Sequence, residues 1–182
     1  TVISYRIHLL FLLMTFDSIL SNRVQYCTEL NETKWSGSKF AVIKNLATTH
    51  KGDFGEEFIT DLLNEIGVEA ERINKGKGSF DVFAKPKKLE IKTATEDTNG
   101  SFQFNGIKKH IDYDYVVCLG VSPNEMWFNI FSREQCLALT TSMVKDGSET
   151  FKLTATKNQG SKWFVKPLTN EMDFALEVEK YV

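Results

Sequence analysis

Two carboxylates and a lysine stand in the middle of the sequence in a pattern suited to cation binding and phosphate chemistry. Asp81 lies in a short apolar stretch, and Glu90 and Lys92 lie two residues apart in the next one. Because alternate residues of a β-strand point to the same face, Glu90 and Lys92 share a face, and a tight turn at Pro86 would bring Asp81 beside them. Carboxylate oxygens are ligands that Mg²⁺ prefers, and a neighbouring lysine can orient a water molecule or stabilise charge on a phosphate.

A third carboxylate, Glu56, follows Gly55 in the amphipathic segment that precedes these stretches. Alternation of Lys and Glu is also common on solvated strand faces, so the spacing of Glu90 and Lys92 does not by itself establish a site. The order of the elements strengthens the interpretation, because a helix with Gly-Glu precedes an Asp strand and then a Glu-x-Lys strand.

The elements that would position these residues follow from hydrophobic periodicity. Residues 53–66 have apolar side chains at helical spacing, and Gly67 ends this helix. The composition predicts strands at 68–73, 80–84, 89–93, 113–121 and 125–131, a loop at 74–79 and a short helix within 102–111. Ser132 and Gln135 have capping-box spacing, which predicts a further helix. The predicted fold class is α/β, with a central mixed sheet flanked by helices.

The composition fits one soluble domain. The chain has 182 residues, 42% of them hydrophobic, and a formal net charge of -2, so charge alone indicates no nucleic-acid partner. Three widely spaced cysteines favour a reducing compartment, and we expect a cytoplasmic location. The apolar run at 7–16 is too short to span a membrane, which favours a buried element over a targeting segment. We expect a single domain at 1–182, with a core at about 51–138, an N-terminal extension of uncertain role at 1–48 and a DNA-contacting region and tail at 139–182.

Three short motifs resemble the PD-(D/E)XK nuclease superfamily. They are KGDFGE at 51–56, SFDVFA at 79–84 and LEIK at 89–92, and the resemblance covers about half of the chain. It implies a restriction-endonuclease-like core, metal-binding carboxylates at Asp81, Glu90 and Glu56, a catalytic lysine at Lys92 and Mg²⁺ as the cofactor. Glu57 is the alternative to Glu56, because the helix register at this end is open. The chain departs from the pattern where Phe80 stands in place of the proline.

Two later segments narrow the resemblance. FQFNGIKK at 102–109 and YDYVVCLGVSP at 113–123 look like segments of certain type II restriction endonucleases. This implies sequence-specific cleavage of double-stranded DNA, and a homodimer would supply one active centre for each strand. The start of the core also resembles archaeal Holliday-junction resolvases, so resolution of branched DNA, or another repair or recombination nuclease, is the alternative. A DNA-binding module that has lost catalysis is a further one.

Basic and amide residues near these motifs are candidates for DNA contacts. The candidates are Lys75, Lys77, Gln103, Asn105, Lys108, Lys157 and Lys162. Residues 150–170 contain no acid, and the polar stretch at 154–162 is the candidate recognition loop. Amide side chains can read adenine edges or contact phosphates, although they can equally stabilise a turn. No Walker-type glycine-rich loop is present, so we expect no nucleotide cofactor, and we expect no membrane partner.

Overall fold

The computed structural model describes residues 16–73, 80–145 and 147–181, and the chain divides into two compact units, Thr1–Ser38 and Lys39–Val182. In the first unit, most side chains of helix α2 (Phe16–Trp35) whose burial is described are exposed. No helix among the described residues is long and apolar enough to cross a membrane. The apolar element expected at 7–16 lies, apart from its last residue, outside the described residues. The predicted division into extension, core and tail stays a prediction.

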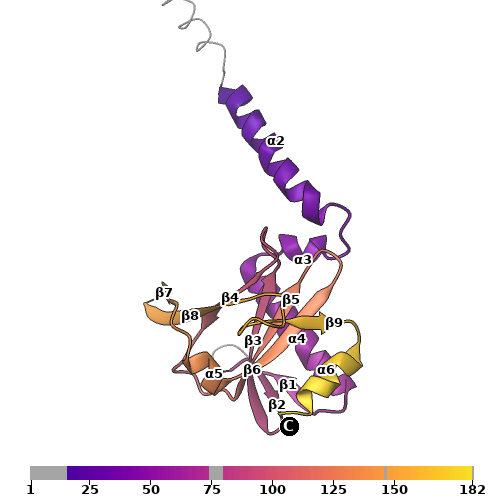
Figure 1. Ribbon diagram of the computed structural model, residues 1–182, viewed down its shortest axis with the longest axis vertical. Helices are drawn as coiled ribbons and strands as arrows, with labels where there is room; N and C mark the ends of the chain where they lie inside the picture. Colours follow the sequence, from indigo (N-terminus) through magenta and orange to yellow (C-terminus); the bar gives the residue numbers. More distant parts are fainter. Residues whose placement is uncertain (1–15, 74–79, 146, 182) are drawn as a thin grey trace, which may run out of the picture. The chain divides into compact units, whose positions relative to one another are not determined.

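Six strands form the main sheet of the larger unit, in the order β1-β2-β3-β5-β6-β9 (Figure 1). They are β1 (Ala70–Arg72), β2 (Val82–Ala84), β3 (Lys87–Thr95), β5 (Tyr115–Val121), β6 (Met126–Ser132) and β9 (Lys166–Leu168). β3 and β5 pair in parallel, and the other neighbouring strands pair antiparallel. The sheet is therefore mixed, and the predicted α/β fold class is confirmed.

Helices α4 and α6 cover one face of this sheet. The helices of the larger unit are α3 (Ala41–Asn45), α4 (Thr48–Glu65), α5 (Arg133–Leu137) and α6 (Glu171–Val178). Ile59 and Leu63 of α4 and Phe174 of α6 share a core with side chains of β2, β3, β5 and β6. The helix predicted at 53–66 is confirmed, and it begins earlier, at Thr48.

Gly55 allows α4 to approach β3 closely. A Cβ atom at Gly55 would lie 1.8 Å from the Oγ1 atom of Thr93, which is far inside any real contact distance. A side chain at this position would therefore push the helix away from the strand. Glycine costs helix stability, so its presence here reflects the packing of α4 on β3.

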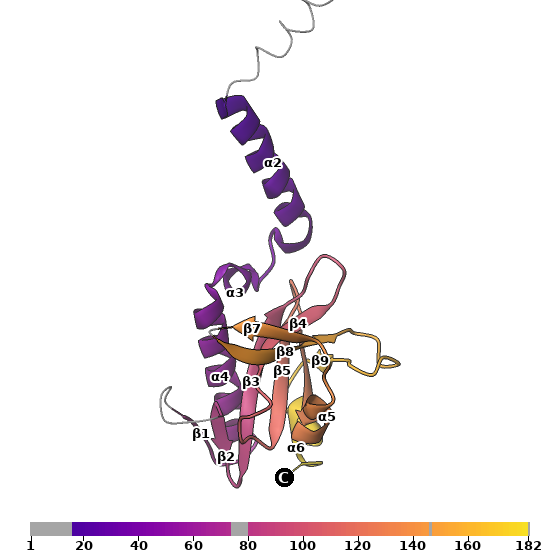
Figure 2. The same ribbon diagram turned by 90° about the vertical axis from the view of Figure 1, so that its left-hand side faces the viewer.

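A second, three-stranded antiparallel sheet covers the opposite face. Its strand order is β4-β8-β7, with β4 (Phe102–Ile107), β7 (Ser142–Lys145) and β8 (Ser148–Ala155). In Figure 2, β4 and β8 pass in front of β3 and β5, and Phe102, Phe104 and Leu153 share a core with Val116 and Cys118 of β5.

The helix predicted within 102–111 is wrong, because residues 102–107 form strand β4. Phe102 and Phe104 are buried, whereas Gln103 and Asn105 are exposed, so the segment has the two-residue period of a strand. Aromatic residues also favour strands. Pairing with β8, far along the sequence, provides the hydrogen bonds that a helix would have made locally.

The remaining predicted elements match the structure within a few residues. The strands expected at 68–73, 80–84, 89–93, 113–121 and 125–131 correspond to β1, β2, β3, β5 and β6. The capping box is confirmed at the start of α5: Ser132 Oγ accepts from the Gln135 backbone N–H, and Gln135 Oε1 accepts from the Ser132 N–H at 2.8 Å. The loop predicted at 74–79 lies outside the described residues.

Candidate active site

The hairpin of β2 and β3 brings Asp81 beside Glu90. The backbone N–H of Asp81 donates to the Leu89 carbonyl at 2.9 Å, which continues the ladder one residue before β2 begins. The backbone N–H of Ile91 donates to Asp81 Oδ2 at 2.8 Å. The Asp81 carboxylate is therefore held against β3 by the strand itself.

Lys92 lies between the two carboxylates. Its Nζ atom forms an ion pair with Glu90 Oε1 and lies 4.0 Å from Asp81 Oδ2. Only 18% of the Lys92 side chain and 7% of the Glu90 side chain are exposed, while 23% of the Asp81 side chain reaches solvent. The convergence expected from the alternation of β3 is present, and the catalytic and metal-binding roles of the three residues stay predictions.

The main sheet points these side chains away from α4. Leu89 and Ile91 belong to the core beneath α4, so Glu90 and Lys92 face the side that the second sheet covers. Ala94, two residues beyond Lys92, packs in the core between the two sheets. Glu90 and Lys92 thus lie on the covered face of the main sheet. Asp81 is the most exposed of the three residues, which we call the Asp81 cluster.

Burial and charge shift the proton affinities within this cluster. Burial raises the pKa of Glu90, and although the Lys92 ammonium opposes this shift, the Asp81 carboxylate adds to it. Burial alone would lower the pKa of Lys92, but the charges of Glu90 and Asp81 outweigh burial, and the pKa is raised. Lys92 is therefore a cation at neutral pH, and one ammonium serves two acids. Buried groups perturbed in this way are common at functional sites.

Two further residues lie within electrostatic reach of Glu90. The charge of Lys108 lowers the pKa of Glu90 in opposition to burial, and the exposed Lys108 follows directly after β4. Tyr113 is buried, and its hydroxyl has no hydrogen-bond partner among the described residues. Burial raises the pKa of Tyr113, and the Glu90 charge adds to that shift. The sequence predicts no role for Tyr113 beyond its place in the strand expected at 113–121 and in the segment YDYVVCLGVSP. No residue near it in the sequence indicates that Glu90 lies close to it in the fold.

The structure places Glu56 with Arg72 of β1. Arg72 Nε donates to Glu56 Oε2 at 2.7 Å, Nη1 to Glu57 Oε1 at 3.0 Å and Nη2 to Asp53 Oδ1 at 2.6 Å. Glu56 is buried and Glu57 is exposed, so Glu56 is the one of the two that faces the interior. Arg72 pairs with Val82, the residue after Asp81. The carboxylates of α4 therefore pair with Arg72, and those of Asp81 and Glu90 pair with Lys92. The two clusters are neighbours but have separate positively charged side chains.

A cation fits the donors of the Asp81 cluster. Among the described residues, no three His, Cys, Asp or Glu side chains form a set that could hold a metal ion. Mg²⁺ is usually bound in proteins through one or two carboxylates, with waters and substrate phosphate completing its shell. Asp81 and Glu90 match that donor set, and Glu56 as a further ligand stays a prediction.

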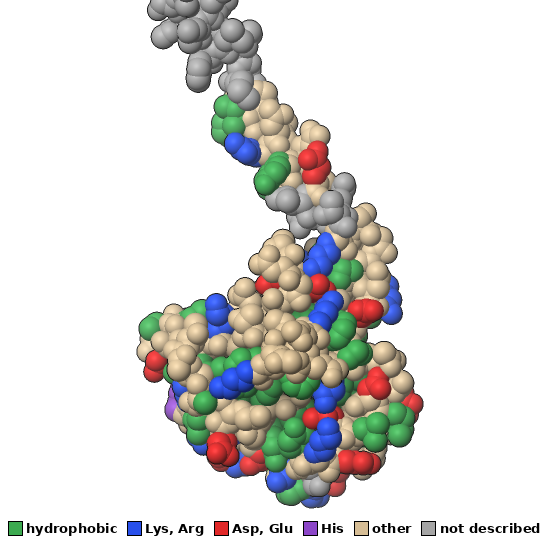
Figure 3. Space-filling view, in the orientation of Figure 1, with side chains coloured by type: hydrophobic (Ala, Val, Ile, Leu, Met, Phe, Trp, Pro, Cys, Tyr) green, Lys and Arg blue, Asp and Glu red, His purple; other side chains and the backbone are tan. Residues whose placement is uncertain are grey.

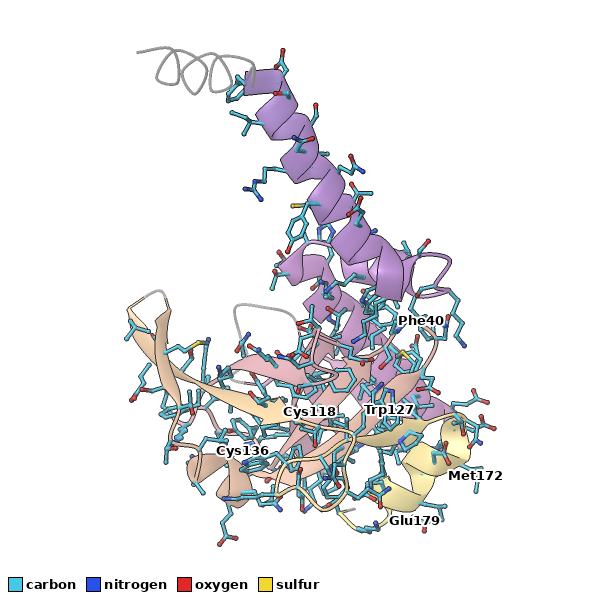
Figure 4. The ribbon with its side chains drawn as sticks, turned by 45° about the horizontal axis from the view of Figure 1, so that its top comes forward. Phe40, Cys118, Trp127, Cys136, Met172 and Glu179 are labelled. Carbon is cyan, nitrogen blue, oxygen red and sulfur yellow. The ribbon has the colours of Figure 1, made fainter. Side chains whose placement is uncertain are left out.

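Cysteine chemistry is a poor alternative for this region. Cys118 of β5 and Cys136 of α5 are both buried in the core between the sheets (Figure 4). Burial raises the pKa of Cys136 to about 12 and raises that of Cys118 as well. Both thiols are therefore protonated at neutral pH, and a thiol is a far weaker nucleophile than a thiolate.

The predicted DNA-binding residues fall into different surroundings. Gln103 and Asn105 are exposed on β4. Lys157 Nζ pairs with the buried Glu96 at 2.9 Å and lies 4.7 Å from the ring centre of Trp127, so its charge is already partnered inside the protein.

Three other lysines among the predicted DNA-binding residues are Lys162, Lys75 and Lys77. Lys162 is exposed, and its Nζ atom lies 5.1 Å from the ring centre of Trp163. Lys75 and Lys77 lie outside the described residues. On the face of the molecule that Figure 3 shows, Lys and Arg side chains are interspersed with acidic and apolar ones.

No protein-family model matches the chain. No curated protein matches it either. Among solved structures, a bacterial homing endonuclease is similar with a TM-score of 0.49 and 11% sequence identity, over 74% of this chain and 95% of that chain. A likeness of this extent does not by itself indicate what the chain does.

Proposed function

We propose that this protein is a Mg²⁺-dependent DNA endonuclease that hydrolyses phosphodiester bonds. The observation that supports the proposal is the convergence of Asp81, Glu90 and Lys92 on the paired strands β2 and β3. Two carboxylates share one ammonium, so the cluster is short of positive charge and suits a divalent cation. A divalent cation and a fixed ammonium group can both stabilise negative charge on a phosphate diester during hydrolysis.

Each residue has a role in this proposal that its surroundings support. Asp81 and Glu90 would hold the cation, which when bound supplies positive charge beside the phosphate and makes a coordinated water more acidic. Lys92 keeps its proton because the two carboxylates raise its pKa. Its ammonium group would donate a hydrogen bond to the attacking water or to a phosphate oxygen and so stabilise charge in the transition state.

We further propose that cleavage is sequence-specific and cuts both strands, as in type II restriction endonucleases. The chain carries one such cluster among its described residues, so cleavage of both strands of a symmetric site requires two copies. We therefore expect a homodimer on DNA. Sedimentation with and without a cleavable duplex measures this, and a strict 1:1 complex on that duplex would reject the dimer.

Incubation with supercoiled plasmid DNA tests the proposal. With Mg²⁺ we expect discrete linear fragments, and with a chelator in place of Mg²⁺ we expect intact plasmid. Cleavage of four-way junctions alone would support a resolvase instead. Binding of duplex DNA without cleavage at any Mg²⁺ concentration would reject the endonuclease and support a DNA-binding module.

A further inference from the structure

Strands β4 and β8 of the second sheet have one apolar face and one polar face. Phe102 and Phe104 of β4 and Leu153 of β8 point into the core between the sheets. The alternate residues point outward, and Gln103 lies directly opposite Thr154 in the strand register. Both outward side chains are exposed.

The outward face is built from groups that read nucleic-acid bases. Its side chains on β4 and β8 are the amides of Gln103 and Asn105, the hydroxyl of Thr154 and the ammonium of Lys152. Within the described part of the chain, none of these side-chain groups takes part in a hydrogen bond. Residues 102–107 and 150–155, the part of β8 that pairs with β4, contain no acid; Glu149, the one acid of β8, lies at its other end opposite Val144 of β7.

A bulge in β4 is followed by a lysine that lies near the candidate active site. The pairing of β4 with β8 shifts register between Phe104 and Ile107, and Gly106 has a φ of 78°, a conformation that glycine adopts without strain. Directly after the bulge, Lys108 reaches within electrostatic range of Glu90. The chain directly after β4 therefore comes within electrostatic range of the Asp81 cluster.

The dimensions of a strand pair restrict the kind of ligand. The major groove of B-DNA, about 12 Å wide, admits a two-stranded β-ribbon, whereas the minor groove, about 6 Å wide, must be widened before strands can bind it. Amide side chains can make paired hydrogen bonds to adenine, and a hydroxyl or ammonium group can contact bases or phosphates. The surface thus matches the major groove of a duplex in shape, charge and hydrogen-bonding groups.

We propose that the outward face of β4 and β8 enters the DNA major groove, with Gln103 and Asn105 contacting base edges and Lys152 contacting a phosphate. This inference rests on the proposed function in that it takes duplex DNA as the partner. It assigns sequence reading to the second sheet, whereas the sequence alone predicts a recognition loop at 154–162.

Selection from a pool of random duplexes tests the inference without cleavage. The full-length chain is incubated with the pool in chelator, and the bound fraction is sequenced. Gln103→Ala and Asn105→Ala should each relax the preference at one or two base positions by about 5-fold to 150-fold, the equivalent of about 1–3 kcal/mol. Gln159→Ala, an exposed amide in the loop, is the matched control and should leave the preference unchanged.

The lysine contact has its own readout. Lys152→Ala should weaken binding to all sequences alike and reduce the salt slope by about one unit. Lys39→Ala is the matched variant, because this exposed lysine lies outside β4 and β8, and it should leave the slope unchanged. Unchanged unfolding midpoints of four variants, Gln103→Ala, Asn105→Ala, Lys152→Ala and Gln159→Ala, would show that binding effects do not arise from misfolding.

The outcomes separate this inference from the proposed function. Altered preference in Gln159→Ala but not in Gln103→Ala or Asn105→Ala would overturn the sheet and favour the loop. A bound fraction with no sequence preference would also overturn it. A preference that depends on Gln103 or Asn105, in a chain that never cleaves, would support the inference and reject the endonuclease.

Discussion

Two buried glutamates of this protein pair with lysines and yet differ in proton affinity. Glu90 on β3 and Glu177 on α6 are each 5% exposed. Glu177 Oε2 pairs with both Lys166 and Lys180, the latter at 2.6 Å, whereas Glu90 shares Lys92 with Asp81. One region has two ammonium groups for one acid, and the other has two acids for one ammonium group.

The pKa shifts follow from these charge counts. Burial alone would raise the pKa of Glu177, but the hydrogen bonds and charges of Lys166 and Lys180 outweigh burial and lower it. The pKa of Glu90 is raised instead. The Glu177 ion pairs are complete and join α6 to β9, which is a structural role. The Glu90 cluster is short of positive charge, which is the condition that favours binding of a further cation.

The two regions should differ most in how far the rate of DNA cleavage falls when the glutamate of each is replaced. Glu90→Gln keeps the size of the side chain but removes a cation ligand, so we expect the single-turnover rate on plasmid DNA to fall on the order of 10³-fold. Glu177→Gln should keep the wild-type rate within about twofold at temperatures where it is folded. Equal losses of cleavage rate in the two variants would mean that the Asp81 cluster is a structural ion pair, as the Glu177 region is.

The packing beneath the Glu90 cluster should be sensitive to one added methyl group. Gly55→Ala places a Cβ atom 1.8 Å from Thr93 Oγ1 and should lower the free energy of unfolding by about 3 kcal/mol. Gly52→Ala is the matched control: its Cβ atom would lie 4.0 Å from Glu56 Oε1, and it should stabilise the helix by about 0.5–1 kcal/mol. Denaturant unfolding measures both, and a neutral Gly55→Ala would contradict the close approach of α4 to β3.

The Glu177 region should contribute stability in a pH-dependent way. Its folded pKa lies below the ordinary value of 4.5, so the contribution is complete above that pH and is lost as the pH falls through the folded pKa. We expect Glu177→Gln to cost about 1–2 kcal/mol of unfolding free energy at pH 7 and much less near pH 3. Glu179→Gln, exposed at the end of the same helix, is the control. A cost that is equal at both pH values would show that the ion pairs are not its source.

The helix carboxylates should give the smallest effect on cleavage. Glu56→Gln can still accept a hydrogen bond from Arg72, and a helix glutamate that contacts a cation through water typically matters by about tenfold. Glu57→Gln, on the same arginine but exposed, should change the rate by less than about twofold. Single-turnover rates at saturating Mg²⁺ decide between them. A larger loss of cleavage rate in Glu57→Gln than in Glu56→Gln would make Glu57 the helix carboxylate that acts on the cation.

The convergence at β2 and β3 was predictable because it depends on local rules. A two-residue period put Glu90 and Lys92 on one face, and a short hairpin put Asp81 opposite. The second sheet was not predictable in this way, since β4 finds its partner β8 far along the chain, and the composition of 102–111 favours a helix. The alternation of Phe102, Gln103 and Phe104 was the available signal for a strand.

The partners of buried charged side chains could not be predicted from sequence spacing either, because they come from distant elements. Arg72 reaches Glu56 only after β1 has paired with β2 beside α4, and Lys157 reaches Glu96 only after the chain has passed through the second sheet. Glu177 is one of four acids between residues 171 and 179, and tertiary packing buries it. Residue spacing predicts which side chains share an element, whereas their partners depend on how distant elements pack.

The rate of plasmid cleavage by Asp81→Asn across a range of Mg²⁺ concentrations tests the central claim most directly. The variant keeps the shape of Asp81 and an oxygen that can accept from the Ile91 N–H, but it removes the negative charge. We predict a loss on the order of 10³-fold at every Mg²⁺ concentration, while Asp61→Asn, an exposed carboxylate on α4, keeps the wild-type rate. Mg²⁺-dependent cleavage by Asp81→Asn at close to the wild-type rate would contradict the account.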